Sequence, residues 1–141
     1  MIAVDTNILV RVLTDDEESP EQTEQARALV KAAKRVFVPQ VVQVEFVWVL
    51  EQAYDLEKDD VVAALETLRD DPTYELQHPE HFIQALMRFR QSNAGFADSI
   101  IAVESQQANM TLWTFDRKLS KQEGVQRLLP ASLAEFESQK N

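Results

Sequence analysis

Short apolar segments alternate with helical patterns along the chain, and this alternation is the feature that most restricts the fold. The segments that read as buried strands are 2–4, 36–38, 74–76 and 111–115. The stretches between them predict helices at 20–34, 39–54, 60–68, 79–91 and 96–107. This order predicts an α/β fold with a central parallel sheet and helices on both faces. Folds of this kind place their working site beyond the carboxyl ends of the strands.

Several helix starts are marked by residues that favour the N-cap position. Asp5 or Thr6 is expected to cap a short helix after the first strand. Ser19 directly precedes a proline, which predicts a helix start at that point. The other predicted starts are Pro39, Asp59 as the cap of helix 60–68, Pro79, and Ser132 with Glu135 as the capping box of a last helix.

The composition is typical of an ordinary globular domain. The chain has 141 residues, of which 45% are hydrophobic, so we expect one domain over residues 1–141. It contains no cysteine, which excludes disulfides, thiol nucleophiles and thiolate metal sites. The apolar N-terminal segment is short and carries Asp5, unlike a signal peptide, and no apolar run is long enough to span a bilayer. We therefore expect a cytoplasmic protein without a membrane segment.

The net charge of −10 argues at face value against nucleic acid, because binding to phosphates normally needs a basic face. Most of these charges are expected to serve solubility. Two other roles stay open, since clustered carboxylates bind cations and an acidic surface attracts a basic partner. The basic residues that lie in local groups and could touch phosphate are Lys31, Lys34 and Arg35, then Arg88 and Arg90, then Arg117, Lys118 and Lys121.

Glu45 lies in a segment, 41–50, that is apolar on nearly every side and is therefore expected to be buried. A lone buried carboxylate is costly unless it is paired, protonated or bound to a metal. The alternative is a glutamate that pairs with a buried arginine or reaches water at the helix edge.

Three aspartates stand at similarly unusual positions. Asp98 lies in an apolar helical segment, 96–103, where its ordinary role would be an N-cap. Asp5 and Asp116 each follow an apolar strand directly, and their ordinary role would be a turn or a cap. Both would nevertheless stand at the carboxyl end of a parallel strand.

These four carboxylates could meet at one edge of the sheet. Carboxylates that lie close together repel one another and raise each other's pKa unless a cation neutralises them. Mg²⁺ and Mn²⁺ prefer oxygen ligands of this kind. Such ions can activate water and stabilise the leaving oxygen of a phosphodiester, so the site would supply its own positive charge.

Other catalytic arrangements have little support in the sequence. The chain has two glycines, too few for a phosphate-binding glycine loop. The only histidines, His78 and His81, flank a predicted helix start, and nothing points to a serine–histidine–aspartate triad.

At this point the sequence resembles the PIN-domain ribonucleases. Residues 1–11 (MIAVDTNILVR) look like the opening strand and first acidic motif of that family. Residues 38–50 resemble the helix that brings its second acid, and 96–102 and 114–119 resemble its third and fourth motifs. The most similar subgroup is the toxin half of the bacterial VapBC toxin–antitoxin pairs.

This resemblance implies a PIN-like three-layer sandwich and a Mg²⁺- or Mn²⁺-dependent endoribonuclease. It implies a homodimer that is inhibited by a small cognate antitoxin protein. The residues that it maps onto the family's roles are Asp5, Glu45, Asp98 and Asp116 as catalytic and metal-binding acids, Thr6, Asn7 and Thr114 as hydrogen-bond partners of the carboxylates or water, and Arg11, Arg117 and Lys118 as possible RNA contacts.

Two alternatives stay open. A module of the same fold could hold RNA or a protein without cutting it, although a full set of acids argues against this. An acidic phosphoryl-accepting domain would also cluster aspartates at strand ends, but it would leave Glu45 unexplained.

Overall fold

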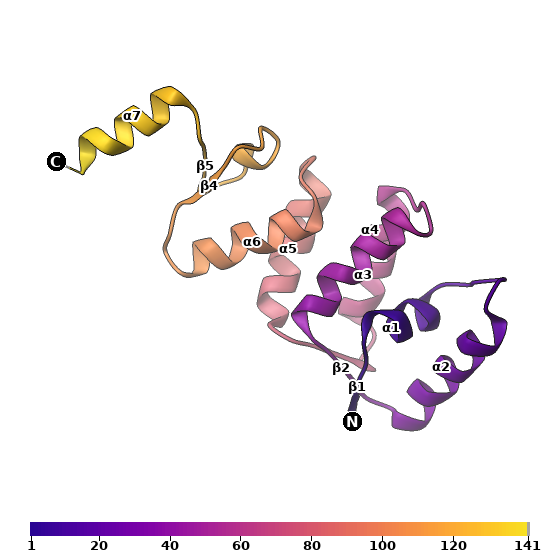
Figure 1. The fold of residues 1–141 in the computed structure, drawn as a ribbon. Helices are drawn as coiled ribbons and strands as arrows, with labels where there is room; N and C mark the ends of the chain where they lie inside the picture. Colours follow the sequence, from indigo (N-terminus) through magenta and orange to yellow (C-terminus); the bar gives the residue numbers. More distant parts are fainter. Residues whose placement is uncertain (141) are drawn as a thin grey trace. The chain divides into compact units, whose positions relative to one another are not determined.

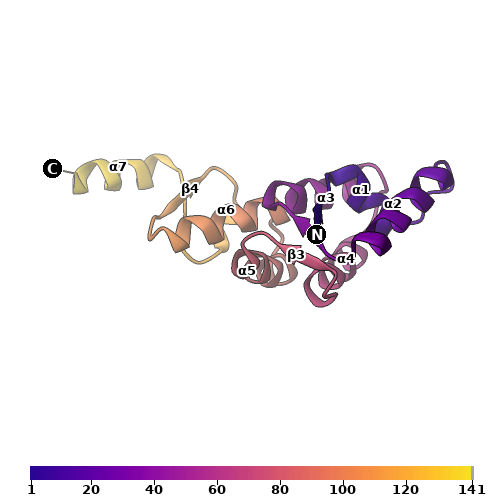
Figure 2. The same ribbon diagram turned by 90° about the horizontal axis from the view of Figure 1, so that it is seen from below.

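The structure is a computed structural model that describes residues 1–140 (Figures 1 and 2). The chain divides into two compact units, unit 1 over Met1–Glu80 and unit 2 over His81–Asn141, which are described in turn. Among residues 1–140, no helix combines the length and the apolar character that crossing a membrane requires. The expectation of one domain over residues 1–141 stays a prediction.

Unit 1 is built from three short strands and four helices. The strands are β1 (Ile2–Ala3), β2 (Val36–Val38) and β3 (Tyr74–Leu76), and the helices are α1 (Thr6–Leu13), α2 (Pro20–Ala33), α3 (Gln40–Gln52) and α4 (Lys58–Asp70). The three strands form a parallel sheet in the order β1-β2-β3. Helix α1 packs against both α2 and α3.

The core of unit 1 is made of the apolar stripes of its helices and the centre of its sheet. Phe46 and Leu50 of α3 are fully buried, as are Leu65 and Leu68 of α4. Their spacing of three and four residues places each pair on one helical face. Val36 and Val38 of β2 are fully buried as well.

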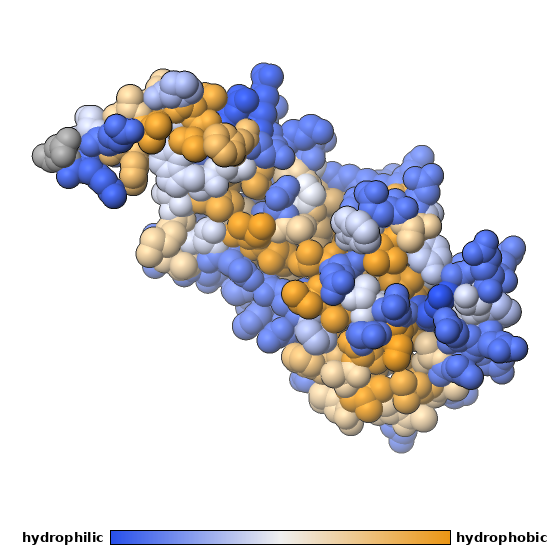
Figure 3. All heavy atoms as spheres, viewed as in Figure 1, coloured by the Kyte–Doolittle hydropathy of each residue, from blue (hydrophilic) through white to orange (hydrophobic). Residues whose placement is uncertain are grey.

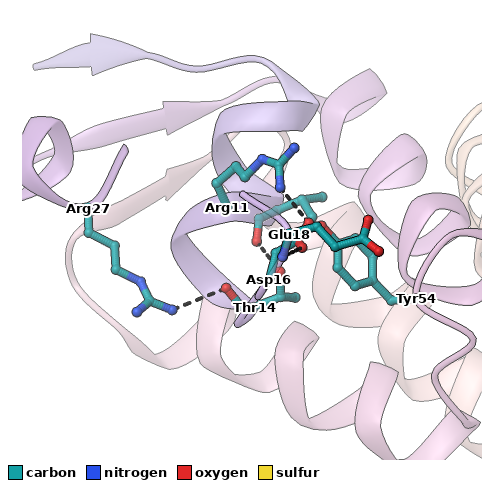
Figure 4. Close-up of polar contacts among 7 residues, drawn as sticks. Arg11, Thr14, Asp16, Glu18, Arg27 and Tyr54 are labelled. Carbon is teal, nitrogen blue, oxygen red and sulfur yellow. Dashed lines mark hydrogen bonds and ion pairs between the residues drawn. The ribbon is translucent and has the colours of Figure 1, made fainter. Parts of the chain in front are cut away.

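Polar contacts hold the connection between α1 and α2, which carries hydrophilic side chains on the face seen in Figure 3. The Arg27 guanidinium in α2 donates to the carbonyl oxygens of Val12 and Thr14, at 3.2 and 3.1 Å. It also pairs with Asp15 at 2.9 Å. The carboxylate of Asp16 accepts hydrogen bonds from Arg11 and Tyr54 (Figure 4). The end of α1 is thereby tied to α2 and to the residues that follow α3.

Unit 2 contains a second parallel pair of strands. Helix α5 (Pro79–Gln91) leads into it, followed by α6 (Phe96–Gln107), β4 (Leu112–Thr114), the 3-10 turn η1 (Leu119–Lys121), β5 (Val125–Arg127) and α7 (Pro130–Gln139). Strands β4 and β5 run parallel, with Trp113 opposite Gln126. Phe96 of α6 meets Phe82 and Phe89 of α5 edge-on, with ring centroids 5.8 and 6.0 Å away.

The predicted α/β class with parallel strands is confirmed, and its strands lie in two sheets, one in each unit. Strand β5 was not predicted, because Val125–Arg127 has a polar central residue and no apolar run. The four predicted strands all occur, with the first one shortened to Ile2–Ala3 and the last one to Leu112–Thr114.

Two predicted caps differ from the structure. Helix α4 begins after Glu57, so Asp59 lies within its first turn rather than at the cap. Ser132 is the third residue of α7, and its hydroxyl accepts the N–H of Leu129 at 2.8 Å. Ser19 occupies the N-cap position of α2 as predicted, although its side chain makes no cap hydrogen bond. For Asp59 and Ser132 the polar residue was identified correctly, but a pattern alone does not fix where the first helical turn begins.

Candidate active site

Asp5 stands close to where the sequence predicted it, two residues beyond the end of β1 and at the N-cap of α1. Its Oδ1 accepts the N–H of Ile8 at 3.1 Å, and its side chain is exposed. Within residues 1–140, no hydrogen bond is made to its Oδ2. Asp5 therefore combines a structural bond through one oxygen with a second oxygen that is available to a ligand.

Glu45 is exposed, so the prediction of a buried carboxylate in α3 was wrong. Helix α3 buries the stripe that contains Phe46 and Leu50, and its opposite face carries Glu45 between Val41 and Trp48. These two apolar side chains are 68% and 63% exposed. The apolar residues around Glu45 thus belong to an uncovered surface of unit 1 rather than to its core.

Asp98 is the third residue of α6, and Gly95 occupies the N-cap position. The ordinary role of an N-cap is therefore wrong for Asp98. Its side chain is half-buried, and no hydrogen bond reaches it from residues 1–140. Burial raises the pKa of the Asp98 carboxyl, and the negative charge of Asp116 raises it further.

Asp116 follows β4 and organises the turn after it. Its Oδ1 accepts the N–H groups of Lys118 and Leu119 at 2.7 and 3.1 Å. The Thr114 hydroxyl oxygen accepts the N–H of Asp116 at 3.0 Å. Thr114 therefore positions the Asp116 backbone, and Asp116 in turn holds the turn that leads into η1.

A hydrogen-bond network that the sequence did not reveal links the segment after η1 to α6. The Gln122 amide donates to Ser99 Oγ and Ser92 Oγ at 3.3 and 3.2 Å. Its carbonyl oxygen accepts from Arg88 at 3.1 Å. Ser99 is fully buried and directly follows Asp98. The network thereby holds the helix that carries Asp98 against the segment that Asp116 begins, and the only signal for it was a serine inside the apolar stretch of α6.

The remaining predicted site residues lie close to these acids in sequence. Thr6 is buried and Asn7 is exposed at the start of α1. Arg117 and Lys118 are exposed in the turn after Asp116. Arg11 is part of a wall of a cavity, described next.

A cavity of about 400 Å³ lies between α1 and α2 in unit 1. Its walls combine carboxylate, guanidinium, amide and aliphatic groups. The residues that line it are Asp5, Asn7, Ile8 and Arg11 from the N-cap and body of α1, and Gln22, Gln25, Ala26 and Leu29 from α2.

The four predicted acids belong to two units, with Asp5 and Glu45 in unit 1 and Asp98 and Asp116 in unit 2. In the part of the chain that the structure describes, no three acidic or histidine side chains form a ready-made metal site. The structure does bring Asp98 close enough to Asp116 for their charges to interact. Two carboxylates whose charges repel each other favour a bound cation, the more so because the Asp98 carboxylate is half-buried and receives no hydrogen bond from residues 1–140.

Comparisons with known proteins agree with the motifs in the sequence. Residues 2–125 match the model of the PIN domain. The chain is 26% identical over 123 residues to a VapC ribonuclease of Aquifex aeolicus (strain VF5), and the match covers 86% of this chain and 91% of that protein. The chain belongs to the PIN-domain family, and its α/β architecture of parallel strands and helices is that of a PIN domain.

Proposed function

We propose that this protein is a divalent-metal-dependent endoribonuclease that acts in the cytoplasm as the toxin of a toxin–antitoxin pair. Asp5, Glu45, Asp98 and Asp116 hold the cation, which is Mg²⁺ or Mn²⁺. The match to a VapC ribonuclease over most of both chains supports the reaction class.

The observation that carries the proposal is the relation between Asp98 and Asp116. The Asp98 carboxyl is half-buried, receives no hydrogen bond from residues 1–140 and interacts with a second negative charge. Folding therefore keeps a carboxylate where its ionised form is disfavoured. A positive charge bound at this position would offset that cost.

The chemistry of the donors fits a hard cation. Carboxylate oxygens are the ligands that Mg²⁺ and Mn²⁺ prefer. Asp116 uses Oδ1 to fix its turn and Asp5 uses Oδ1 to cap α1, so each has Oδ2 left for a ligand. A bound divalent cation would activate water and neutralise charge on the phosphodiester.

The residues around the acids have distinct roles in this proposal. Thr114 holds the backbone of Asp116, and Gln122 binds Ser99 at the start of α6, so these residues support the two acids without using Asp98 or the Oδ2 of Asp116. Thr6 and Asn7 follow Asp5 directly and are proposed to orient it or a water molecule. The exposed side chains of Arg117 and Lys118 are proposed to contact the RNA backbone.

The net charge of −10 supports a basic inhibitor. We expect a cognate antitoxin to place an arginine against the exposed carboxylates, because guanidinium and carboxylate form strong paired hydrogen bonds. The overall charge would speed the encounter of the two proteins. By likeness to the toxin subgroup, the active form is proposed to be a homodimer.

The proposal is tested by RNA cleavage with purified protein. Wild type, Asp98→Asn and Asp5→Asn are incubated with structured RNA and total cellular RNA in Mg²⁺, in Mn²⁺ and in chelator. We expect the wild type to cleave RNA only when metal is present. We expect the cleavage rate of each variant to fall more than about a hundredfold, because losing a metal ligand lowers activity more than losing a residue that supports a ligand.

Glu104→Gln is the matched control, since Glu104 is an exposed acid on the same helix as Asp98. It is expected to cleave like the wild type. Equal cleavage by wild type and Asp98→Asn would contradict the proposal. RNA binding without cleavage in either metal would instead favour a non-cleaving PIN module.

A further inference from the structure

The cavity between α1 and α2 has the size and the chemistry of a ligand site. Its volume of about 400 Å³ lies within the range of about 300–1,000 Å³ that is typical of small-molecule pockets. Asp5 is one of its lining residues. A ligand in this cavity is therefore next to a carboxylate of the proposed catalytic site.

We propose that this cavity binds the base and ribose of one nucleotide of the RNA, next to the phosphodiester that is cut. The inference rests on the proposed ribonuclease activity and adds to it the place where the sequence of the substrate is read.

The walls suit a nucleobase better than a phosphate. Ile8 and Leu29 supply aliphatic surface for the faces of a flat ring. Gln22 and Gln25 are three residues apart on α2, which places their side chains on one helical face. Primary amides both donate and accept hydrogen bonds, and they are the groups that proteins use to read base edges. The lining contains one cation and one acid, so it offers a neutral base a better environment than it offers a second phosphate.

The Arg11 side chain, which lines this cavity, is held in place by an ion pair. One of its nitrogens, Nη1, pairs with Asp16 Oδ2 at 2.5 Å. The Tyr54 hydroxyl donates to the same oxygen at 2.9 Å, and the Glu18 N–H donates to Asp16 Oδ1 at 2.9 Å (Figure 4). Within residues 1–140 the guanidinium makes no other hydrogen bond. Its remaining N–H groups are available to the ribose or phosphate of a bound nucleotide.

A segment of a protein partner is the other class of ligand that a surface cavity could take. The position beside Asp5 favours the nucleotide, because an RNA strand whose phosphate lies at the catalytic acids must place an adjoining base near them. Helix α2 also presents two amides to the cavity, whereas its one large apolar lining residue, Leu29, is 42% exposed.

Binding is tested first without any cleavage. The wild-type protein is titrated in chelator with each of the four ribonucleoside 5′-monophosphates, and the side-chain amide signals of Gln22, Gln25 and the lining residue Asn7 are followed by NMR, so that Asn7 still reports binding in a variant without the two glutamines. We expect these signals to shift with one base preferred. The double variant Gln22→Ala/Gln25→Ala should bind that nucleotide about tenfold more weakly, as for the loss of one good base contact. Gln52→Ala, an exposed glutamine of unit 1 outside the cavity, should bind like the wild type.

The cleavage experiment supplies the second readout. RNA ends produced by wild type and double variant are sequenced, and the base preference beside the cut is compared. A preference that is present in the wild type and lost in the double variant supports the inference. Unmoved amide signals, or an unchanged preference in an active double variant, would overturn it. Signals that shift with an antitoxin but with none of the nucleotides would also overturn it, in favour of a protein-docking surface. The NMR outcome is independent of metal and cleavage, so a failure of the ribonuclease proposal would be seen separately in the absence of cut RNA.

Discussion

At the scale of single residues, Asp116 has two roles that can be separated. Its Oδ1 accepts two backbone N–H groups in the turn that leads into η1, while its charge adds to the effect of burial in raising the pKa of Asp98. An asparagine keeps an oxygen at the position of Oδ1 and removes the charge, whereas an alanine removes both. The two substitutions therefore distinguish the structural role of this carboxylate from its electrostatic role.

We predict that Asp116→Asn unfolds at nearly the same urea concentration as the wild type. Asp116→Ala should lose about 1 kcal/mol of unfolding free energy, the usual cost of removing a capping side chain. In the asparagine variant the pKa of the Asp98 carboxyl should fall toward its ordinary value, because a neighbouring negative charge is gone, and NMR titration of that carboxyl measures the change. Equal destabilisation by both substitutions, with an unmoved Asp98 pKa, would mean that the two acids do not interact.

The acids also show what sequence patterns can and cannot reveal about a single side chain. The prediction that Asp98 stands in an apolar environment holds, since it is half-buried on a helix with a buried stripe. The same argument failed for Glu45, because α3 has apolar residues on every side and only one of its faces packs in unit 1. Periodicity locates the buried face of an amphipathic helix, but it gives no direction when the whole helix is apolar.

At the scale of elements, the connection between α1 and α2 depends on one carboxylate. Asp16 accepts hydrogen bonds from the Glu18 backbone, from Tyr54 beyond the end of α3, and from Arg11 of α1. These contacts, with the Glu18 N–H the largest cause, lower the pKa of Asp16 below its ordinary value of 3.8. Ionised Asp16 therefore stabilises the folded protein.

We predict that Asp16→Asn is less stable than the wild type at neutral pH and that the difference disappears in acid. A carboxyl group with a lowered folded-state pKa contributes stability fully above its unfolded value, and it loses that contribution as the pH falls through the folded value. The deficit of the variant should thus be complete above about pH 5 and should shrink below pH 3.8. Urea unfolding across this range measures it, with the exposed Glu104→Gln as control. A deficit that is independent of pH would show that the asparagine acts through packing rather than charge.

The elements themselves were largely predictable, and the contacts between them were not. Prolines and polar caps marked most helix starts, since their effect on the backbone is local. Strand β5 escaped prediction because it is defined by its pairing with β4, a partner thirteen residues earlier whose register no local pattern contains. The hydrogen bonds of Gln122 to Ser92 and Ser99 join positions far apart in the sequence, so they became visible only in the folded unit.

At the scale of the whole molecule, the proposed cation ligands come from both units, with Asp5 and Glu45 in unit 1 and Asp98 and Asp116 in unit 2. Measurements of thermal stability can show which of these acids bind the cation. Burial and the charge of Asp116 raise the pKa of Asp98 above 3.8. Ionising this group therefore opposes folding above that pH, and the opposition vanishes as the pH falls below it. Metal-free Asp98→Asn should accordingly be more stable than the metal-free wild type at neutral pH, with the difference absent in acid.

We predict that Mg²⁺ or Mn²⁺ raises the melting temperature of the wild type, because a ligand that binds only the folded state stabilises it by about 2.7 kcal/mol at a hundred times its dissociation constant. Chelator should reverse the increase. Asp98→Asn, in unit 2, and Asp5→Asn, in unit 1, should each lose most of it, whereas Glu104→Gln should keep it. If Asp98→Asn abolished the increase and Asp5→Asn left it intact, unit 2 would bind the cation alone and Asp5 would act on the RNA rather than on the metal. If neither substitution reduced it, the cation would bind at other carboxylates, and the assignment of both acids as ligands would be wrong.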